Sequence, residues 1–252
     1  MEELRALASK LGFHGIARHW DEYSKLSWVA ELLIMEQKEK EVRNLDARLK
    51  EAKIGSFKPM AEFDWDWPAS IDRAQIEELF TLDFVTEPLN IALIGNEGLG
   101  KTMIMQNLAY EAAKRGYRAM FVKASKMLNE LIESDGKKTR QATLNRLCKI
   151  DVLCIDEIGY MNYDNRYADL LYEVIAERYS RKSTIISTNK EFNLWSEIFP
   201  TAACVVTLVD KIVHKSEIVV VKGKSYRLHE AKLREEQKSK LRKSKVSKGA
   251  KK

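Results

Sequence analysis

The chain has 252 residues, 45% hydrophobic and 32% charged, which suits a water-soluble protein with one large domain or with a medium and a small domain. No apolar run approaches the ~18 residues of a membrane span, and the first residues lack the apolar core of a signal peptide, so we expect a cytoplasmic protein without membrane contact. The three cysteines lack Cys-x-x-Cys spacing, so we expect reduced thiols without disulfides. The net charge of +6 lies at the end of the chain, because residues 231–252 carry +8 and the rest of the chain carries −2.

Residues 1–54 are expected to be helical. A first apolar face begins at Leu4 and ends before Gly12, and a longer one runs from Trp28 to Leu49 at helical spacing. Between residues 36 and 53 the other positions are almost all charged, with both signs present. Two interpretations remain open here: a solvated helix face, or a small module that contacts a partner or the DNA backbone through its basic side chains.

Residues 55–68 have the composition of a connector. Phe63, Trp65 and Trp67 alternate with acidic residues and are followed by Pro68. Aromatic side chains stack on nucleic-acid bases, but the neighbouring carboxylates would repel phosphates. We therefore expect these rings to dock the connector onto the adjoining domain, before a helix over residues 72–82.

The segment from Asn90 to Thr102 carries the most specific motif. Five mostly apolar residues, expected to form a strand, lead into a loop with Gly95, Gly98 and Gly100, and a helix-compatible run follows to residue 114. This is the P-loop pattern, in which backbone N–H groups and a helix N-terminus cradle phosphates. We expect the phosphate-binding residues to be Gly95, Asn96, Glu97, Gly98, Leu99, Gly100, Lys101 and Thr102, with the Thr102 hydroxyl on Mg²⁺.

After the P-loop, strands and helices alternate. Strands are expected at residues 119–122, 151–155 and 183–187, and helices at 126–133, 139–148, 167–181 and 202–215. Residues 218–221 and 225–228 are expected to close a hairpin around Gly223. The alternation indicates an α/β fold with a parallel sheet flanked by helices.

Polar residues follow two of these strands. Asp156 and Glu157 end one apolar strand and Asn189 follows the next. Ligands of parallel sheets bind at the carboxyl ends of the strands. Asp156 can therefore hold Mg²⁺ near the phosphates, Glu157 can activate the attacking water, and Asn189 can report the γ-phosphate.

These motifs resemble the IstB-like ATP-binding proteins, the transposition helpers of bacterial insertion sequences, which are related to DnaC-type helicase loaders. The resemblance rests on residues 95–102, 154–160, 177–184, 187–189, 209–214 and 222–227, together with the helical N-terminus and the connector. It implies an AAA+ P-loop NTPase preceded by a small all-helical N-terminal domain. The implied cofactors are ATP and Mg²⁺.

The resemblance also implies an assembly and its partners. Members of the family oligomerise around double-stranded DNA, with ATP at the subunit interfaces, and recruit or stimulate a cognate transposase at the target site. By position, Arg227 matches a late arginine that senses the γ-phosphate. Lys211 stands where the family usually has an arginine that reaches the neighbour's ATP; lysine lacks the planar fork, so hydrolysis is expected to be slow unless Arg178 or Arg181 substitutes.

The expected organisation is an N-terminal DNA- or partner-binding domain (1–57), a connector (58–88), an ATPase domain (89–230) and a basic, disordered tail (231–252). The tail is expected to contact DNA nonspecifically. A DNA-stimulated ATPase that selects transposition targets is the leading hypothesis. A replicative helicase loader and a nucleotide-gated DNA scaffold with little turnover remain alternatives.

Overall fold

The computed structural model describes residues 2–134, 136–160, 165–199 and 203–249, and the side chains of residue 137 and of residues 239–249 are not described. The chain forms two compact units, residues 1–50 and 51–252. The first ends before the boundary expected at residue 57, because Ala52 and Ile54 are buried in the core of the second. No helix in the described ranges has the length and apolar character to cross a membrane.

The N-terminal unit consists of helices. Ala8, Ala17, Trp20, Val29 and Leu33 form its buried core. The first predicted face and the residues Val29 and Leu33 of the second thus gather around one small centre, whereas Trp28, Met35 and Val42 of the second face are exposed. Its helices are α1 (Glu2–Leu11), α2 (His14–Arg18), α3 (Trp20–Tyr23) and the first part of α4 (Ser27–Ala52).

A parallel sheet of five strands organises the second unit, in the order β2-β3-β4-β1-β5. The strand in the P-loop motif, β1, is buried along its whole length, as expected for a parallel strand covered on both faces. The strands are β1 (Asn90–Ile94), β2 (Ala119–Lys123), β3 (Val152–Ile158), β4 (Ser183–Thr188) and β5 (Ser216–Val220).

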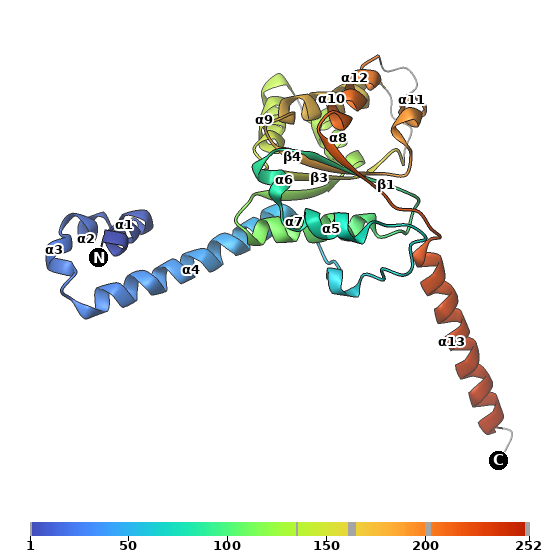
Figure 1. The fold of residues 1–252 in the computed structure, drawn as a ribbon, viewed down its shortest axis with the longest axis horizontal. Helices are drawn as coiled ribbons and strands as arrows, with labels where there is room; N and C mark the ends of the chain where they lie inside the picture. Colours follow the sequence, from blue (N-terminus) through green and yellow to red (C-terminus); the bar gives the residue numbers. More distant parts are fainter. Residues whose placement is uncertain (1, 135, 161–164, 200–202, 250–252) are drawn as a thin grey trace. The chain divides into compact units, whose positions relative to one another are not determined.

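Helices cover both faces of this sheet (Figure 1). On one face α5 (Arg73–Leu79) and α7 (Lys101–Lys114) pack against β1, β3 and β4 in one apolar core. The other face carries α8 (Ala124–Glu133), α9 (Gly136–Cys148), α10 (Asn165–Arg178), α11 (Trp195–Ile198) and α12 (Val205–Val213). The remaining elements are α6 (Asp83–Thr86), the short 3-10 helices η1 (Met60–Glu62) and η2 (Phe192–Leu194), and α13 (Tyr226–Gly249). The α/β fold with helices on both faces of a parallel sheet is confirmed.

The expected hairpin around Gly223 is wrong. β5 pairs in parallel with β1, from Asn90↔Ser216 to Ile94↔Val220, and residues from Tyr226 onward are helical. Gly223 instead packs closely against the connector at Ala69 and against Leu99. The apolar run after α12 forms β5 and pairs with the edge of β1 that β4 does not occupy. The residues after β5 then reach the P-loop.

The tail also differs from the expectation of disorder. Helix α13 continues through residues 231–249, while residues 250–252 lie outside the described part of the chain. Lys, Arg, Glu, Gln and Leu dominate this segment, and all have favourable helix propensities. The lack of apolar periodicity predicted the absence of a packed face, but it does not prevent a helix.

Candidate nucleotide site

The P-loop connects β1 to α7 and is enclosed by two other segments. Gly98 and Gly100 have φ values of +73° and +88°, which side-chain-bearing residues resist. A methyl group at Gly98 would overlap the Ser225 hydroxyl, and one at Gly100 would overlap the Phe63 ring. These two glycines are therefore needed both for the loop conformation and for the close approach of neighbouring segments.

Lys101, the first residue of α7, lies inside the loop with only 5% of its surface exposed. Its Nζ donates hydrogen bonds to the carbonyl oxygens of Gly95, at 2.5 Å, and Asn96, at 2.8 Å. Burial lowers the pKa of Lys101, an effect that the nearby carboxylates of Asp156 and Glu97 oppose. The ammonium group is thus held where loop atoms surround it, and a phosphate oxygen entering the loop would find a donor already in place.

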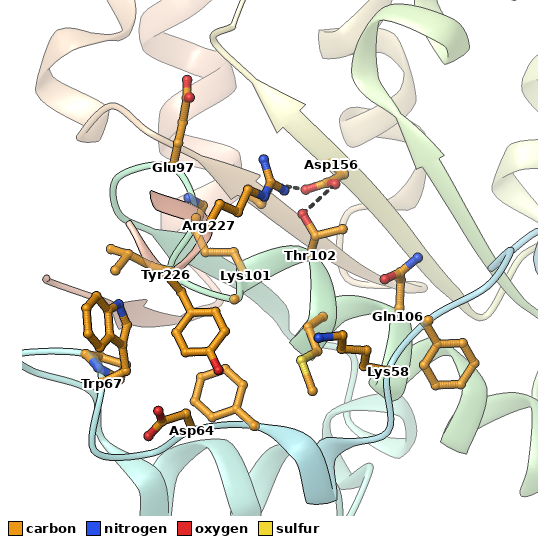
Figure 2. A pocket seen from close by; sticks show the side chains of 18 of the residues that line it. Lys58, Asp64, Trp67, Glu97, Lys101, Thr102, Gln106, Asp156, Tyr226 and Arg227 are labelled. Atoms are coloured by element: carbon orange, nitrogen blue, oxygen red, sulfur yellow. Dashed lines mark hydrogen bonds between the residues drawn. The ribbon is translucent and has the colours of Figure 1, made fainter. Parts of the chain in front are cut away.

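Thr102 and Asp156 meet at the carboxyl end of β3. The Thr102 hydroxyl donates to Asp156 Oδ2 at 3.0 Å (Figure 2). The Ser187 hydroxyl donates to Asp156 Oδ1. Asp156 is 1% exposed. A hydroxyl and a carboxylate side by side are oxygen ligands of the kind Mg²⁺ prefers, so the residues present fit this ion.

Glu157 has an unusual backbone and a basic partner. Its φ is +63°, at the irregularity in the β3–β4 register, and its N–H donates to Ser187 Oγ at 2.9 Å. Its carboxylate forms an ion pair with Lys123 at 2.7 Å. A strained backbone conformation of this kind costs about 1–3 kcal/mol and persists only where neighbours enforce it. Lys123 therefore neutralises the carboxylate that the sequence predicted to activate water.

A cavity of about 630 Å³ adjoins the P-loop. Its walls include Lys101, Thr102, Asp156, Glu157 and Arg227, from three separate elements. In Figure 2 the Arg227 side chain extends toward Asp156, whereas Glu97 points away from Thr102. The Glu97 carboxylate is therefore directed away from the oxygen pair of Thr102 and Asp156.

The connector forms the opposite wall of this cavity, through residues including Phe57, Phe63, Asp64 and Trp67. As expected, its aromatic rings dock it onto the domain: Phe63 is buried and contacts Trp65 at a centroid distance of 4.7 Å. These residues were not among the site residues predicted from the sequence. Helices α5 and α6 separate them from the P-loop strand, so no local pattern linked them to the nucleotide site.

The residues around the start of α13 contact both the P-loop and the connector. The Tyr226 N–H donates to the Gly98 carbonyl oxygen at 2.8 Å. The Trp67 Nε1–H donates to the Lys224 carbonyl oxygen at 2.7 Å, and the Trp67 ring stacks on His229 at 4.1 Å. These contacts bring Arg227, on the first turn of α13, into the cavity wall.

Two predicted residues lie elsewhere. Asn189 follows β4, and its Oδ1 is buried without a hydrogen-bond partner in the described part of the chain. Lys211, on α12, does not belong to the cavity wall; its ammonium group lies 4.8 Å from the centre of the Tyr179 ring. The Tyr179 hydroxyl in turn contacts His214 Nδ1 at 2.7 Å, which fixes the ring that Lys211 covers.

The arginines considered as substitutes for Lys211 differ sharply. Arg178 is 1% exposed and its guanidinium donates to four oxygens of its own unit, so it is not available to a neighbouring subunit. The Arg181 side chain is 75% exposed and forms a long 3.8 Å ion pair with Glu177. Of the two, Arg181 alone remains a candidate.

Comparison with known proteins identifies one protein family that matches most of the chain. The family profile described as IstB-like ATP binding protein matches residues 6–234. A protein of insertion sequence IS5376 from Geobacillus stearothermophilus, named as ATP-binding, is 34% identical over 93% of this chain and 91% of its own length. A protein of the same kind from insertion sequence IS21 of Pseudomonas aeruginosa is 30% identical over 91% of this chain and 90% of its own.

Solved structures share the fold of the second unit. The crystal structure of DnaI is 18% identical and has a TM-score of 0.52, covering 66% of this chain and 89% of DnaI. The structure of the replication initiator DnaA, bound to AMPPCP and single-stranded DNA, is 18% identical and has a TM-score of 0.52. The match covers 64% of this chain and 51% of the DnaA chain. At these identities the likeness shows the fold alone.

Proposed function

The chain belongs to the IstB-like ATP-binding proteins, and we propose that it is a DNA-stimulated ATPase that assembles on double-stranded DNA and recruits or stimulates a cognate transposase. The observation that carries this proposal is the convergence of Lys101, Thr102, Asp156, Glu157 and Arg227 on one cavity beside the P-loop. The relatives of this chain are named for insertion sequences, which supports transposition as the setting.

In this proposal the P-loop holds ATP. Backbone N–H groups of residues 95–100 and the N-terminus of α7 bind the phosphates, and Lys101 exchanges its loop carbonyl partners for β- and γ-phosphate oxygens. Thr102 and Asp156 hold Mg²⁺, which supplies charge neutralisation for the phosphates. The connector residues that line the cavity enclose the rest of the nucleotide.

The residues for hydrolysis follow from the same geometry. Glu157 accepts a proton from the attacking water as the water oxygen bonds to the γ-phosphorus and the bond to the bridging oxygen of ADP breaks. The Asn189 Oδ1 atom, which is buried and has no hydrogen-bond partner among the residues that the structure describes, accepts a hydrogen bond from that water, or the Asn189 side-chain N–H groups sense the γ-phosphate. Arg227 stabilises the phosphate charge within the subunit, and Lys211 acts on the ATP of the neighbouring subunit.

Two observations favour a second function, a nucleotide-gated DNA scaffold with little turnover. The carboxylate proposed to activate water is paired with Lys123, and the residue proposed to act in trans is a lysine rather than an arginine. An arginine in trans accelerates such reactions about 10³–10⁵-fold. A chain that lacks it can bind ATP and DNA while hydrolysing slowly.

ATP hydrolysis measured at low salt, with and without long double-stranded DNA, tests the proposal. The unmodified chain should hydrolyse ATP faster with DNA, and the Glu157→Gln variant should bind ATP but lose the stimulated rate. ATP-dependent DNA binding without turnover above that variant would support the scaffold. Absence of both DNA binding and stimulation would refute the proposal.

A further inference from the structure

Helix α4 of the N-terminal unit has two apolar faces, and the core of that unit covers one of them. Val29 and Leu33 are 1% and 0% exposed and pack against α1 to α3. Trp28, Met35 and Val42 are 49%, 58% and 56% exposed. They recur every seven residues, so they form one line, about 120–160° around the helix from Val29 and Leu33. We call Trp28, Met35 and Val42 the α4 stripe.

The α4 stripe has the composition of a contact surface. Single exposed apolar residues are common on proteins, but three large ones aligned on one helix face are not. Tryptophan and methionine are enriched in protein interfaces, and tryptophan often contributes most of the binding energy. Glu31 and Lys38 lie beside the stripe, both exposed, and neither forms an ion pair within the ranges that the structure describes.

We propose that the α4 stripe binds the α4 stripe of a second copy of this chain, with the two helices antiparallel and crossing at Met35. This interface is separate from any interface formed around ATP. Trp28 and Val42 each lie seven residues from Met35, so the large ring of one copy faces the small side chain of the other. Glu31 precedes Met35 by four residues and Lys38 follows it by three, which brings Glu31 of each copy beside Lys38 of the other at nearly the same height.

The charges are compatible with the antiparallel arrangement, and the packing of the stripe favours it. In a two-fold antiparallel pair Glu31 and Lys38 of the two copies lie on the same side of the contact line and attract each other. A parallel two-fold pair would place the two Glu31 side chains level with each other but on opposite sides of the contact line, and the two Lys38 side chains likewise, so the attraction between Glu31 and Lys38 would be lost. It would also set two Trp28 rings at one level and two Val42 side chains at another, which packs less evenly.

Cysteine cross-linking of the full-length chain tests the arrangement, with the parent chain and its native cysteines as the control. Met35→Cys should form a disulfide-linked dimer under mild oxidation, because Met35 lies on the two-fold axis. Val42→Cys alone should not, whereas a mixture of Trp28→Cys and Val42→Cys chains should give the mixed dimer. A Val42→Cys homodimer would instead indicate a parallel pair, and absence of all these products would overturn the proposal.

A charge exchange tests the same interface without new covalent bonds. By sedimentation equilibrium without ATP or DNA, Glu31→Lys and Lys38→Glu should each raise the dimer dissociation constant about tenfold, since each variant places two repulsive pairs in the dimer. The double variant should restore it, and Asn44→Lys, at an exposed position off the stripe, should not change it. If the chain stays monomeric and the Val42→Lys variant binds the transposase less tightly, the stripe binds the transposase. That result would refute the pairing of two copies. Because nucleotide and DNA are absent, the outcome does not depend on the proposed ATPase function.

Discussion

Replacing Arg178 with methionine should destabilise the second unit. Its Nη1 donates to the carbonyl oxygens of Leu147 and Ile150, each at 2.7 Å. Its Nη2 donates to the Ser183 carbonyl oxygen at 2.5 Å, and its Nε donates to Thr184 Oγ1 at 3.0 Å. One guanidinium therefore joins the end of α9, the segment before β3 and the start of β4.

The magnitude follows from these four bonds and from the cost of burying the charge. A hydrogen bond from a charged group contributes about 1.5–3 kcal/mol, but burial of the ion offsets part of the total. Burial lowers the pKa of Arg178 to about 10, so the group remains charged at neutral pH. We expect Arg178→Met to lower the free energy of unfolding by about 3–5 kcal/mol, because the four oxygens lose their donor. This corresponds to a Tm about 6–20 °C lower for a unit of this size.

Urea unfolding of the full-length chain measures this change, and Arg181→Met is the matched control. The Arg181 side chain is 75% exposed, so its replacement should alter the free energy of unfolding by less than about 0.5 kcal/mol. If Arg178→Met kept the stability of the unmodified chain and lost only ATP hydrolysis, the structural role of Arg178 would be refuted. Arg178 would then return as a candidate for the ATP site of a neighbouring subunit.

Three further predictions concern the nucleotide site. First, burial lowers the pKa of Lys101, and only the protonated form attracts phosphate, so ATP affinity should fall as pH rises through that pKa, at a lower pH than a surface lysine would give. Fluorescent-nucleotide titrations from pH 7 to 10 measure this fall. The same dependence of ATP affinity on pH in the Lys101→Arg variant would contradict the prediction. Second, Gly100→Ala should weaken ATP binding at least about tenfold, because the methyl overlaps the Phe63 ring, whereas Gly116→Ala, also at positive φ but with open space around it, should leave ATP affinity unchanged; Phe63→Ala should partly rescue Gly100→Ala. Third, Lys123→Ala should raise the DNA-free ATPase rate several-fold by releasing the Glu157 carboxylate, while the neighbouring exposed Lys126→Ala should not; a lower rate in Lys123→Ala would mean that the ion pair orients Glu157 for catalysis.

The nucleotide-binding half of the fold could be predicted because its signals are local. Each strand that delivers a polar residue is a short apolar run, and the P-loop glycines are required by backbone geometry within one turn. The parallel order of β1, β3 and β4 then brings the ends of those strands together. Asp156 and Thr102 are 54 residues apart in sequence, yet they meet because Asp156 lies in the last part of β3 and Thr102 lies in the helix that follows β1 of the same sheet.

Contacts between distant segments could not be predicted in this way. The run at residues 218–221 is apolar and β-branched, as is typical of a strand, but this composition does not identify a pairing partner, and β5 pairs with β1 instead of with a hairpin strand. The aromatic connector was expected to dock, yet its position against Gly100 depends on a close approach that no local pattern encodes. Arg178 shows the same limit, because its burial depends on four oxygens from three segments.

The continuity of α13 changes how the basic end of the chain relates to the nucleotide site. A disordered tail would contact DNA independently of the ATPase domain. The structure instead begins this helix at Tyr226, whose N–H is bonded to the Gly98 carbonyl of the P-loop, and Arg227 follows in the cavity wall. The Trp67–His229 stack and the Lys58–Glu230 ion pair, at 3.5 Å, hold the same turn against the connector. Because a helix transmits displacement along its axis, a force on the basic residues beyond residue 231 would act on the turn that carries Arg227.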